Sequence, residues 1–188
     1  MIHSADDFTK LASTVETIIV DNNVCNDPSF SRLDLQPFSC LKALEVGNYS
    51  CCYVDEVLLV GLKKLERVEV GVFSFGKMKN RLAIPLVLNR RFALRDCERM
   101  KELKVGRGSF YDYYLFEVEN VPSLEVIDMG DWKEDGAVFY WASLTLRSMV
   151  SWAVSSIDLL GLKTLRLGRG DFWDCHRAVF ESGGFVGG

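Results

Sequence analysis

The chain has 188 residues and a formal net charge of -4, and 48% of its residues are hydrophobic and 26% charged. This composition is typical of a globular protein and argues against a disordered chain, a collagen-like repeat or a coiled coil. The small excess of acidic residues, 26 against 22 basic ones, argues against a nucleic-acid partner, because phosphate binding requires a dense field of lysine and arginine.

The first eight residues, MIHSADDF, carry two acids where a secretory signal carries basic and then apolar residues. No apolar run approaches the roughly 20 residues of a membrane-spanning helix. We therefore predict a cytoplasmic protein with no membrane contact. The cysteines at positions 25, 40, 51, 52, 97 and 175 form no CxxC pair and have no histidine at ligand spacing. They predict reduced, mostly buried thiols and no metal site.

Residues 1–40 allow two interpretations, an N-terminal cap or a degenerate repeat. A helical cap is indicated by Ser4 or Asp6 as N-cap residues, followed by Phe8, Leu11 and Val15 at helical spacing. A repeat is indicated by the sequence TVETIIVD, which begins at Thr14. Residues 41–188 carry the clear repeats, and the whole chain is predicted to be one domain.

Five segments of the chain share a pattern with apolar residues at positions 1, 4 and 6 and glycine at position 7. They are LKALEVG from Leu41, LERVEVG from Leu65, MKELKVG from Met100, LEVIDMG from Leu124 and LKTLRLG from Leu162. A degenerate copy, LRSMVSW, begins at Leu146, so that successive starts lie 24, 35, 24, 22 and 16 residues apart. Such a repeat predicts coils that bury their apolar interior only by stacking on one another.

Each repeat predicts the same path of the chain. Positions 4 and 6 point to one side of a short strand, because side chains alternate along a strand, and Gly at position 7 allows a sharp bend. Position 11 then returns to the core with Cys51, Phe75, Phe110 and Phe172, and Glu134 is the exception. A second apolar pair near positions 17 and 19, such as Val57 with Leu59, predicts an outer extended segment.

The LxxLxVG pattern at 22 to 24 residue spacing resembles the leucine-rich repeat family, clearly over Leu41 to Phe185 and weakly over Val15 to Cys40. The resemblance implies a right-handed solenoid with a parallel sheet on its concave face. The family's usual Asn at position 9 is replaced, and we expect the Ser or Asp at position 10 to bond to neighbouring backbone N–H groups instead. The convex segments are predicted to be mostly extended and not helical.

Two places interrupt the regular spacing. The unit from Leu65 is about 11 residues too long, and the surplus within residues 76–97 includes the basic residues Lys77, Lys79, Arg81, Arg90 and Arg91. It is either an inserted loop that carries binding or a missed degenerate repeat. The unit from Leu146 has only 16 residues and is predicted to form a flattened or helical turn.

The sequence favours a protein without enzymatic activity. Its two histidines are His3 and His176, and the neighbouring Cys175 projects to the opposite side of an extended strand, so that the pair forms no nucleophile and base. The glycine-rich pieces at Val105 and Leu167 lack the spacing of phosphate loops and recur at one repeat position. We predict no catalytic residues and no cofactor.

The concave face is the predicted binding surface, because the repeat leaves its side chains free. The predicted partner-binding residues are Glu45, Arg67, Glu69, Glu102, Lys104, Arg107, Asp128, Asp131, Arg166 and Arg169. Singly, each charge is better explained by pairing across strands; together they favour a protein or peptide partner. Aromatic residues at position 9, Tyr49, Phe73 and Trp132, with Tyr111, Tyr113, Tyr114 and Trp173 nearby, are either interface anchors or turn packing.

The predicted function is therefore a non-catalytic protein–protein interaction module that binds through the concave sheet. The alternative is a structural, self-assembling repeat protein, or a fragment of a longer repeat array. The sequence FESGGFVGG at the C-terminus shows no capping pattern, and it is the reason that end-to-end self-association is retained as an alternative.

Overall fold

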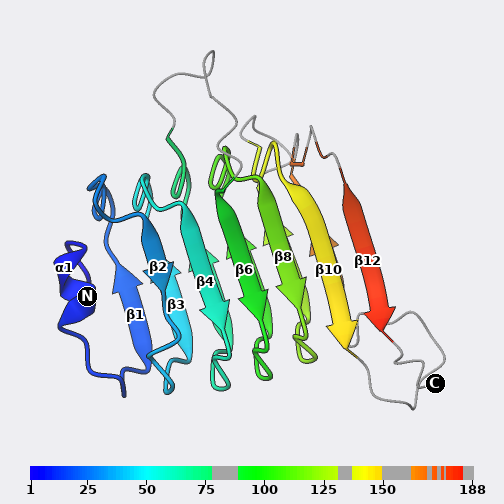
Figure 1. Ribbon diagram of the computed structural model, residues 1–188, viewed down its shortest axis with the longest axis horizontal. Helices are drawn as coiled ribbons and strands as arrows, with labels where there is room; N and C mark the ends of the chain where they lie inside the picture. The colour runs from blue at the N-terminus through cyan, green and yellow to red at the C-terminus, as the bar shows by residue number, and fades with distance from the viewer. Residues whose placement is uncertain are drawn as a thin grey trace.

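The computed structural model describes residues 1–77, 89–130, 137–149, 162–168, 171–172, 175 and 177–183. These residues form one short helix and two parallel sheets that lie one behind the other, with the strands of each sheet side by side (Figure 1). Each coil of the chain supplies one strand to the first sheet and the next strand to the second sheet. The described part of the chain is thus a solenoid-like stack of parallel strands.

The first sheet, called sheet 1, has the strand order β1 (Thr17–Val20), β3 (Ala43–Val46), β5 (Arg67–Val70), β7 (Glu102–Val105), β9 (Val126–Met129) and β11 (Thr164–Arg166). The second, sheet 2, consists of β2 (Arg32–Asp34), β4 (Glu56–Val60), β6 (Arg91–Arg95), β8 (Leu115–Glu119), β10 (Ser143–Met149) and β12 (Ala178–Gly183). The outer segments predicted to be extended are strands of a full second sheet.

The core lies between the two sheets and is built by identical repeat positions in register. In sheet 1, Leu44 pairs with Val68, Val68 with Leu103, and Leu103 with Ile127, and all four are buried. From sheet 2, Val57 and Leu59 point into the same core, as predicted. Alternation along short strands therefore explains why one row of side chains is buried and the next is exposed.

The repeat assigned to Leu146 is wrong. Leu146 lies in β10 of sheet 2, where it pairs with Val118 and Phe180. Its apolar spacing matches a sheet 1 strand because both sheets bury alternate residues. The next strand of sheet 1 after β9 is therefore β11, and residues 150–161, where a flattened or helical turn was predicted, lie outside the described residues. The unit from Leu65 is likewise a single coil of β5 and β6, so its surplus residues are an insertion and not a missed repeat.

The N-terminal 40 residues form both a first coil and a short cap. Strands β1 and β2 pair with β3 and β4, and α1 (Asp6–Thr9) is one turn long. Neither Ser4 nor Asp6 caps it as predicted, because helix position N-cap is Ala5. No side chain caps the helix; instead Asp7, inside the helix, accepts the N–H groups of the preceding His3 and Ser4, each at 3.0 Å, which lowers its pKa. The Asp7 carboxylate thus fixes the entry to the cap.

The side chains at position 11 stack as a column through the core. Phe75 and Phe110 are buried with ring centroids 4.6 Å apart, which confirms the predicted wedge. In the fourth repeat the wedge is Phe139, five residues after Glu134, and it stacks on Phe110 at 4.7 Å. Glu134 itself lies outside the described residues. In the sequence, Phe139 follows Gly130 by five residues more than Phe110 follows Gly106, and a fixed spacing from Leu124 therefore missed Phe139.

Position 10 forms the hydrogen-bonded ladder that was predicted to replace asparagine. Ser50 Oγ accepts the N–H of Val24 at 3.2 Å, Ser74 Oγ that of Ser50 at 3.1 Å, and Ser109 Oγ that of Ser74 at 2.9 Å. The Ser74 hydroxyl also donates to Gly47 O at 2.7 Å in the preceding coil. One buried hydroxyl therefore satisfies two backbone groups of its neighbour.

Glycine at position 7 has two reasons. The predicted bend accounts for Gly130, which is left-handed at φ 68°, and close packing of the coils accounts for others. A Cβ on Gly106 would lie 2.6 Å from the backbone carbon of Gly71, and one on Gly71 would lie 2.9 Å from that of Gly47. In the turns after Gly47 and Gly71 the left-handed residues include Tyr49 and Phe73, at φ 56° and 55°, and not these glycines. Gly71 and Gly106 are needed because successive coils approach too closely for a side chain.

A buried charge network lies where the insertion joins the stack. Arg90 is fully buried and forms ion pairs with Asp55 at 3.0 Å and with Asp112. Tyr113 lies under its guanidinium group and donates a 2.7 Å hydrogen bond to Val54 O. Of the basic residues noted in residues 76–97, Arg90 is thus structural, Arg91 pairs with Glu56 at 3.0 Å, and Lys79 and Arg81 lie outside the described residues.

Candidate functional site

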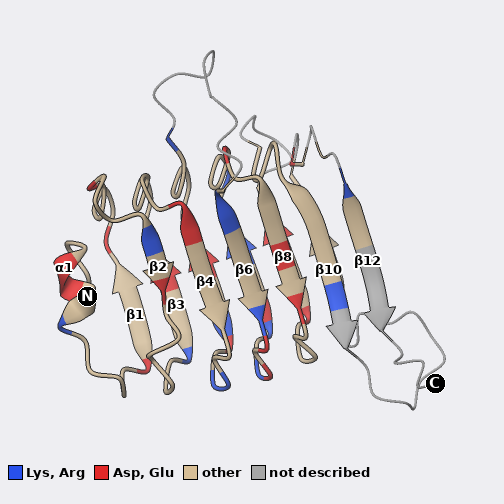
Figure 2. Cartoon of the chain, in the orientation of Figure 1, with Lys and Arg blue, Asp and Glu red and all other residues tan. Residues whose placement is uncertain are grey.

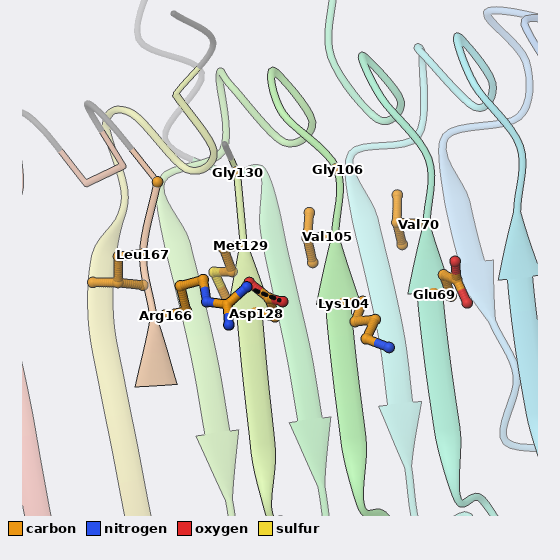
Figure 3. Close-up of a pocket in the computed structure, with 11 residues that line it drawn as sticks. Glu69, Val70, Lys104, Val105, Gly106, Asp128, Met129, Gly130, Arg166 and Leu167 are labelled. Carbon is orange, nitrogen blue, oxygen red and sulfur yellow. Dashed lines mark hydrogen bonds and ion pairs between the residues drawn. The ribbon is translucent and has the colours of Figure 1, made fainter. Parts of the chain in front are cut away.

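A shallow depression lies on the outer face of sheet 1, toward the carboxyl ends of its last four strands (Figure 3). Its volume is about 370 Å³. Four charged side chains, one from each strand, border it: Glu69, Lys104, Asp128 and Arg166. They occupy position 5 of their repeats and therefore point away from the core.

The order of charges along this border follows from strand register. Glu69 pairs with Lys104, Lys104 with Asp128, and Asp128 with Arg166. Negative and positive residues thus alternate across neighbouring strands, which lie about 4.8 Å apart. Arg166 and Asp128 form an ion pair at 3.4 Å, drawn as a dashed line in Figure 3.

The floor of the depression is formed by backbone. Gly106, Gly130 and Gly168 line it at position 7, and the close approach of coils that requires glycine there also leaves no side chain to fill the space. Neighbouring side chains from position 6, Val105 and Met129, are buried beneath it. The depression is therefore a product of the repeat itself.

Four of the ten predicted binding residues meet at this depression. Glu45, Arg67 and Glu102 lie beside it on the same face, where Arg67 pairs with Glu45 and Lys104 pairs with Glu102 at 2.8 Å. Arg107 lies elsewhere, with its guanidinium 5.2 Å from the Phe73 ring centroid. Asp131 and Arg169 lie outside the described residues.

The electrostatics of the face are those of paired surface charges. The Glu102 carboxylate raises the pKa of Lys104 by hydrogen bonding, and Lys104 therefore stays charged at neutral pH. Arg67 bonds to Glu45 and lies 3.7 Å from Glu69. Such exposed pairs contribute about 0 to 1 kcal/mol each, so these groups remain available to a partner's charges.

The aromatic residues of the turns divide between the two predicted roles. Tyr113 is turn packing, since its ring is buried and burial raises its pKa well above the usual range. Tyr49 is half exposed and stacks on Phe73 at 5.4 Å. Trp132 and Trp173 lie outside the described residues.

Two features of the surface were not predicted from the sequence. One is a hollow of about 760 Å³ beside Tyr49 and Phe73, of which the exposed aromatic residues at position 9 were the only signal. The other is the pattern of charges on the outer face of sheet 2. The sequence predicted its extended segments, but not which charged side chains lie opposite one another on neighbouring strands. The register between the strands of sheet 2 could not be predicted, because Leu146, which belongs to β10 of that sheet, was assigned to a strand of sheet 1.

The described residues contain no evident metal site. Within them, no group of three or more His, Cys, Asp or Glu side chains could hold a metal ion, and His176 lies outside them. All six cysteines are free thiols, three of them buried. Burial raises the pKa of Cys97 to about 11, so this thiol is protonated and unreactive at neutral pH.

Comparisons of the chain with protein-family models, with curated proteins and with solved structures find no match. In the described part of the chain, no helix is long and apolar enough to cross a membrane.

Proposed function

We propose that the protein is a divergent leucine-rich-repeat module without catalytic activity, which binds a protein or peptide partner across the outer face of sheet 1. The observation that carries the proposal is the depression bordered by Glu69, Lys104, Asp128 and Arg166. Side chains from four coils point to one continuous surface there, and alternating charges provide the complementarity that selects a partner.

The size of this face supports a protein partner over a small molecule. Six strands at about 4.8 Å spacing give a face roughly 25 Å long, which suits an interface of about 800 Å² per partner. The depression is shallow and polar, whereas sites for small molecules are usually enclosed and mostly apolar. A backbone floor with charged borders therefore fits a polypeptide surface best.

A pull-down quantified by mass spectrometry tests the proposal. The test protein carries Glu69→Gln, Lys104→Gln and Arg166→Gln, and the matched control carries Glu56→Gln, Arg91→Gln and Arg147→Gln on sheet 2. Both triples remove one acid and two bases from a solvent-facing sheet. We expect the sheet 1 triple to lose partners that the wild type and the sheet 2 triple retain, with unchanged circular dichroism. Equal capture by all three proteins would refute sheet 1 as the binding face.

A second candidate function, self-assembly, is favoured by one observation at the last coil. Leu165 and Leu167 are 43% and 40% exposed, although the same repeat positions are buried in β1, β3, β5, β7 and β9. Apolar residues exposed at the end of a solenoid are covered by a cap or by another chain. Assembly through this end is the structural alternative.

Light scattering coupled to size exclusion, over a hundredfold concentration range, separates the two candidates. The interaction module is expected to stay a monomer near 21.3 kDa. Growth of mass with concentration that Leu165→Lys abolishes would favour self-assembly through β11. Growth that the sheet 1 triple abolishes would instead place the self-contact on the proposed binding face.

A further inference from the structure

The turns that follow β3 and β5 enclose a second, apolar hollow of about 760 Å³, separate from the depression on sheet 1. The described residues that line it are Asn26, Tyr49, Cys52, Tyr53, Phe73, Gly76 and Lys77. Three aromatic rings form most of this wall. A mostly apolar hollow with a few polar groups is the usual form of a site that accepts a side chain or small ligand.

The wall is held in place by backbone contacts between turns. The Asn26 amide nitrogen donates to Tyr49 O and its oxygen accepts the N–H of Cys52, both at 2.9 Å. Tyr49 and Phe73 adopt the left-handed conformation at φ 56° and 55°, which directs their rings outward, where they stack on each other. The rings are thus fixed before any ligand binds, and less conformational entropy is lost on binding.

Tyr49 is the residue whose exposure the fold does not explain. The residue is 50% exposed, although the hydrogen bonds of this turn are made by Asn26 and Ser50 and do not involve its side chain. Exposed aromatic rings at the rim of a hollow are typical of interface anchors.

The charge of the hollow indicates what else a ligand should carry. Lys77 is the only charged residue among the described residues that line it. Its ammonium group lies 5.7 Å from the Tyr53 ring centroid and 3.3 Å from Asp55. Asp55 is shared with the buried Arg90 at 3.0 Å, and an ammonium group has three donors. Lys77 can therefore bind a further carboxylate at the edge of the aromatic wall.

We propose that this hollow, lined by Tyr49, Tyr53, Phe73 and Lys77, binds a peptide segment in which an aromatic side chain adjoins an acidic one. The aromatic ring packs against the wall formed by Tyr49, Phe73 and Tyr53, and the acidic group reaches the Lys77 ammonium. This site does not depend on the function proposed for sheet 1, because no residue is shared between the two hollows.

Capped dipeptides test the proposal on the full chain by nuclear magnetic resonance. The probe is acetyl-Phe-Asp-amide, with acetyl-Phe-Asn-amide, acetyl-Phe-Lys-amide and acetyl-Ala-Asp-amide as comparisons. Binding is followed from shifts of the backbone amides of Asn26, Cys52 and Gly76. We expect the Phe-Asp probe to bind most tightly, with about two- to fivefold weaker binding when the acid is replaced by the amide.

Three protein variants accompany the probes. Tyr49→Asn keeps a residue that tolerates positive φ and is expected to weaken binding about tenfold, in line with the loss of one aromatic contact. Lys77→Gln is expected to make the Phe-Asp and Phe-Asn probes equal. Tyr140→Ser removes a partly exposed ring outside the hollow, stacked on Tyr111 at 5.1 Å, and should leave binding unchanged.

Several outcomes would overturn the proposal. No shift at the three amides, or equal binding of the Phe-Asp, Phe-Asn and Phe-Lys probes, would contradict it. Residues 82–88, LAIPLVL, are apolar and close to Lys77 in the sequence. If the probe binds only after residues 78–88 are replaced by a glycine-serine linker, the chain's own segment is the occupant and the proposal is wrong.

Discussion

The outer faces of the two sheets carry charges in different arrangements. On sheet 2, ion pairs run from strand to strand: Arg32 to Glu56 at 2.9 Å and Glu56 to Arg91 at 3.0 Å. A second row joins Arg95 to Glu119 at 3.2 Å and Glu119 to Arg147 at 3.2 Å. In Figure 2 the blue and red segments alternate across β2, β4 and β6 and across β6, β8 and β10.

On sheet 1, charges of opposite sign also face each other in register, but two of the ion pairs form within a strand. Lys104 pairs with Glu102 and Arg67 lies near Glu69. The cross-strand pairs of this face are Arg67 with Glu45 and Arg166 with Asp128, and none joins β5 to β7 or β7 to β9 in the described residues. Under the proposed function, sheet 2 uses its charges to hold coils together, whereas sheet 1 keeps charges that a partner can use. The turns that follow the strands of the two sheets also differ, in their glycines and in the side chains that bond to the backbone. Substitutions in these turns are expected to have the largest effects on stability.

The largest expected effect concerns the glycines of the two sets of turns. Gly106→Ala places a Cβ 2.6 Å from the Gly71 backbone and should lower the free energy of unfolding by about 3 kcal/mol. Gly61, after β4, has φ 70° and open space around it, so Gly61→Ala should cost about 1 kcal/mol and Gly61→Asn less. Urea denaturation measures all three. Equal losses at Gly106 and Gly61 would contradict the close-approach explanation.

Cys97 tests the turns of sheet 2 through pH. Its thiol donates to Leu59 O of the preceding coil at 3.4 Å, and burial raises its pKa to about 11 from an ordinary value of 9.0. The native state therefore retains this proton after the unfolded state has lost it. Stability present below pH 9 should fall by about 2 to 3 kcal/mol as pH rises to 11.

The control for this pH dependence is Cys97→Ala. We expect it to be less stable than the wild type at pH 8 and to lose less stability between pH 8 and pH 11, measured by urea denaturation at each pH. An alkaline loss of the same size in the variant would assign the effect to another group.

Ser74 is the counterpart of Cys97 in the turns of sheet 1. Ser74→Ala leaves the N–H of Ser50 and the carbonyl of Gly47 without their partner, and should cost about 2 kcal/mol. Asn120→Gly, in a turn of sheet 2, keeps the left-handed conformation and removes a bond to Asp96; we expect less than about 1 kcal/mol. Thermal denaturation compares them, and a larger loss at Asn120 would show that the serine ladder is dispensable.

The smallest expected changes in stability compare a charge on the outer face of sheet 2 with one on the outer face of sheet 1. Arg95→Gln breaks ion pairs with Glu117 and Glu119 at 2.9 and 3.2 Å and should destabilise the fold by about 1 kcal/mol. Lys104→Gln should change stability by less than about 0.5 kcal/mol. If Lys104→Gln proves the more destabilising, the charges of sheet 1 serve the fold and the proposed division between the faces fails.

The stacked parallel strands could be predicted from the repeat spacing, because two physical rules determine them: side chains alternate along a strand, and the apolar side must be buried. Alternation identified the buried rows of β3, β5, β7 and β9, and the need to bury one side predicted stacking. The same rules could not separate β10 from a sheet 1 strand, since both bury alternate residues. The wedge Phe139 was missed because its position depends on the length of a turn that no motif marks.

The candidate site was predicted in part. Position 5 identified Glu69, Lys104, Asp128 and Arg166, because outward rows are fixed by register. The depression between them could not be predicted, since it results from the close approach of glycine backbones. Arg90 looked like one of several exposed basic residues, and nothing in the local sequence indicated that Asp55 and Asp112 would surround it.

The network around Arg90 has a consequence for cooperativity. Tyr113, in the coil of β7 and β8, bonds to Val54 in the coil of β3 and β4 and passes over the intervening coil, and Arg90 joins all three coils through Asp55 and Asp112. Repeat stacks usually couple only nearest neighbours, so they can fray coil by coil. Here three coils are joined as one unit, and opening any of them exposes a buried charge. Their amide protons should exchange together and last, after those of the coils at either end.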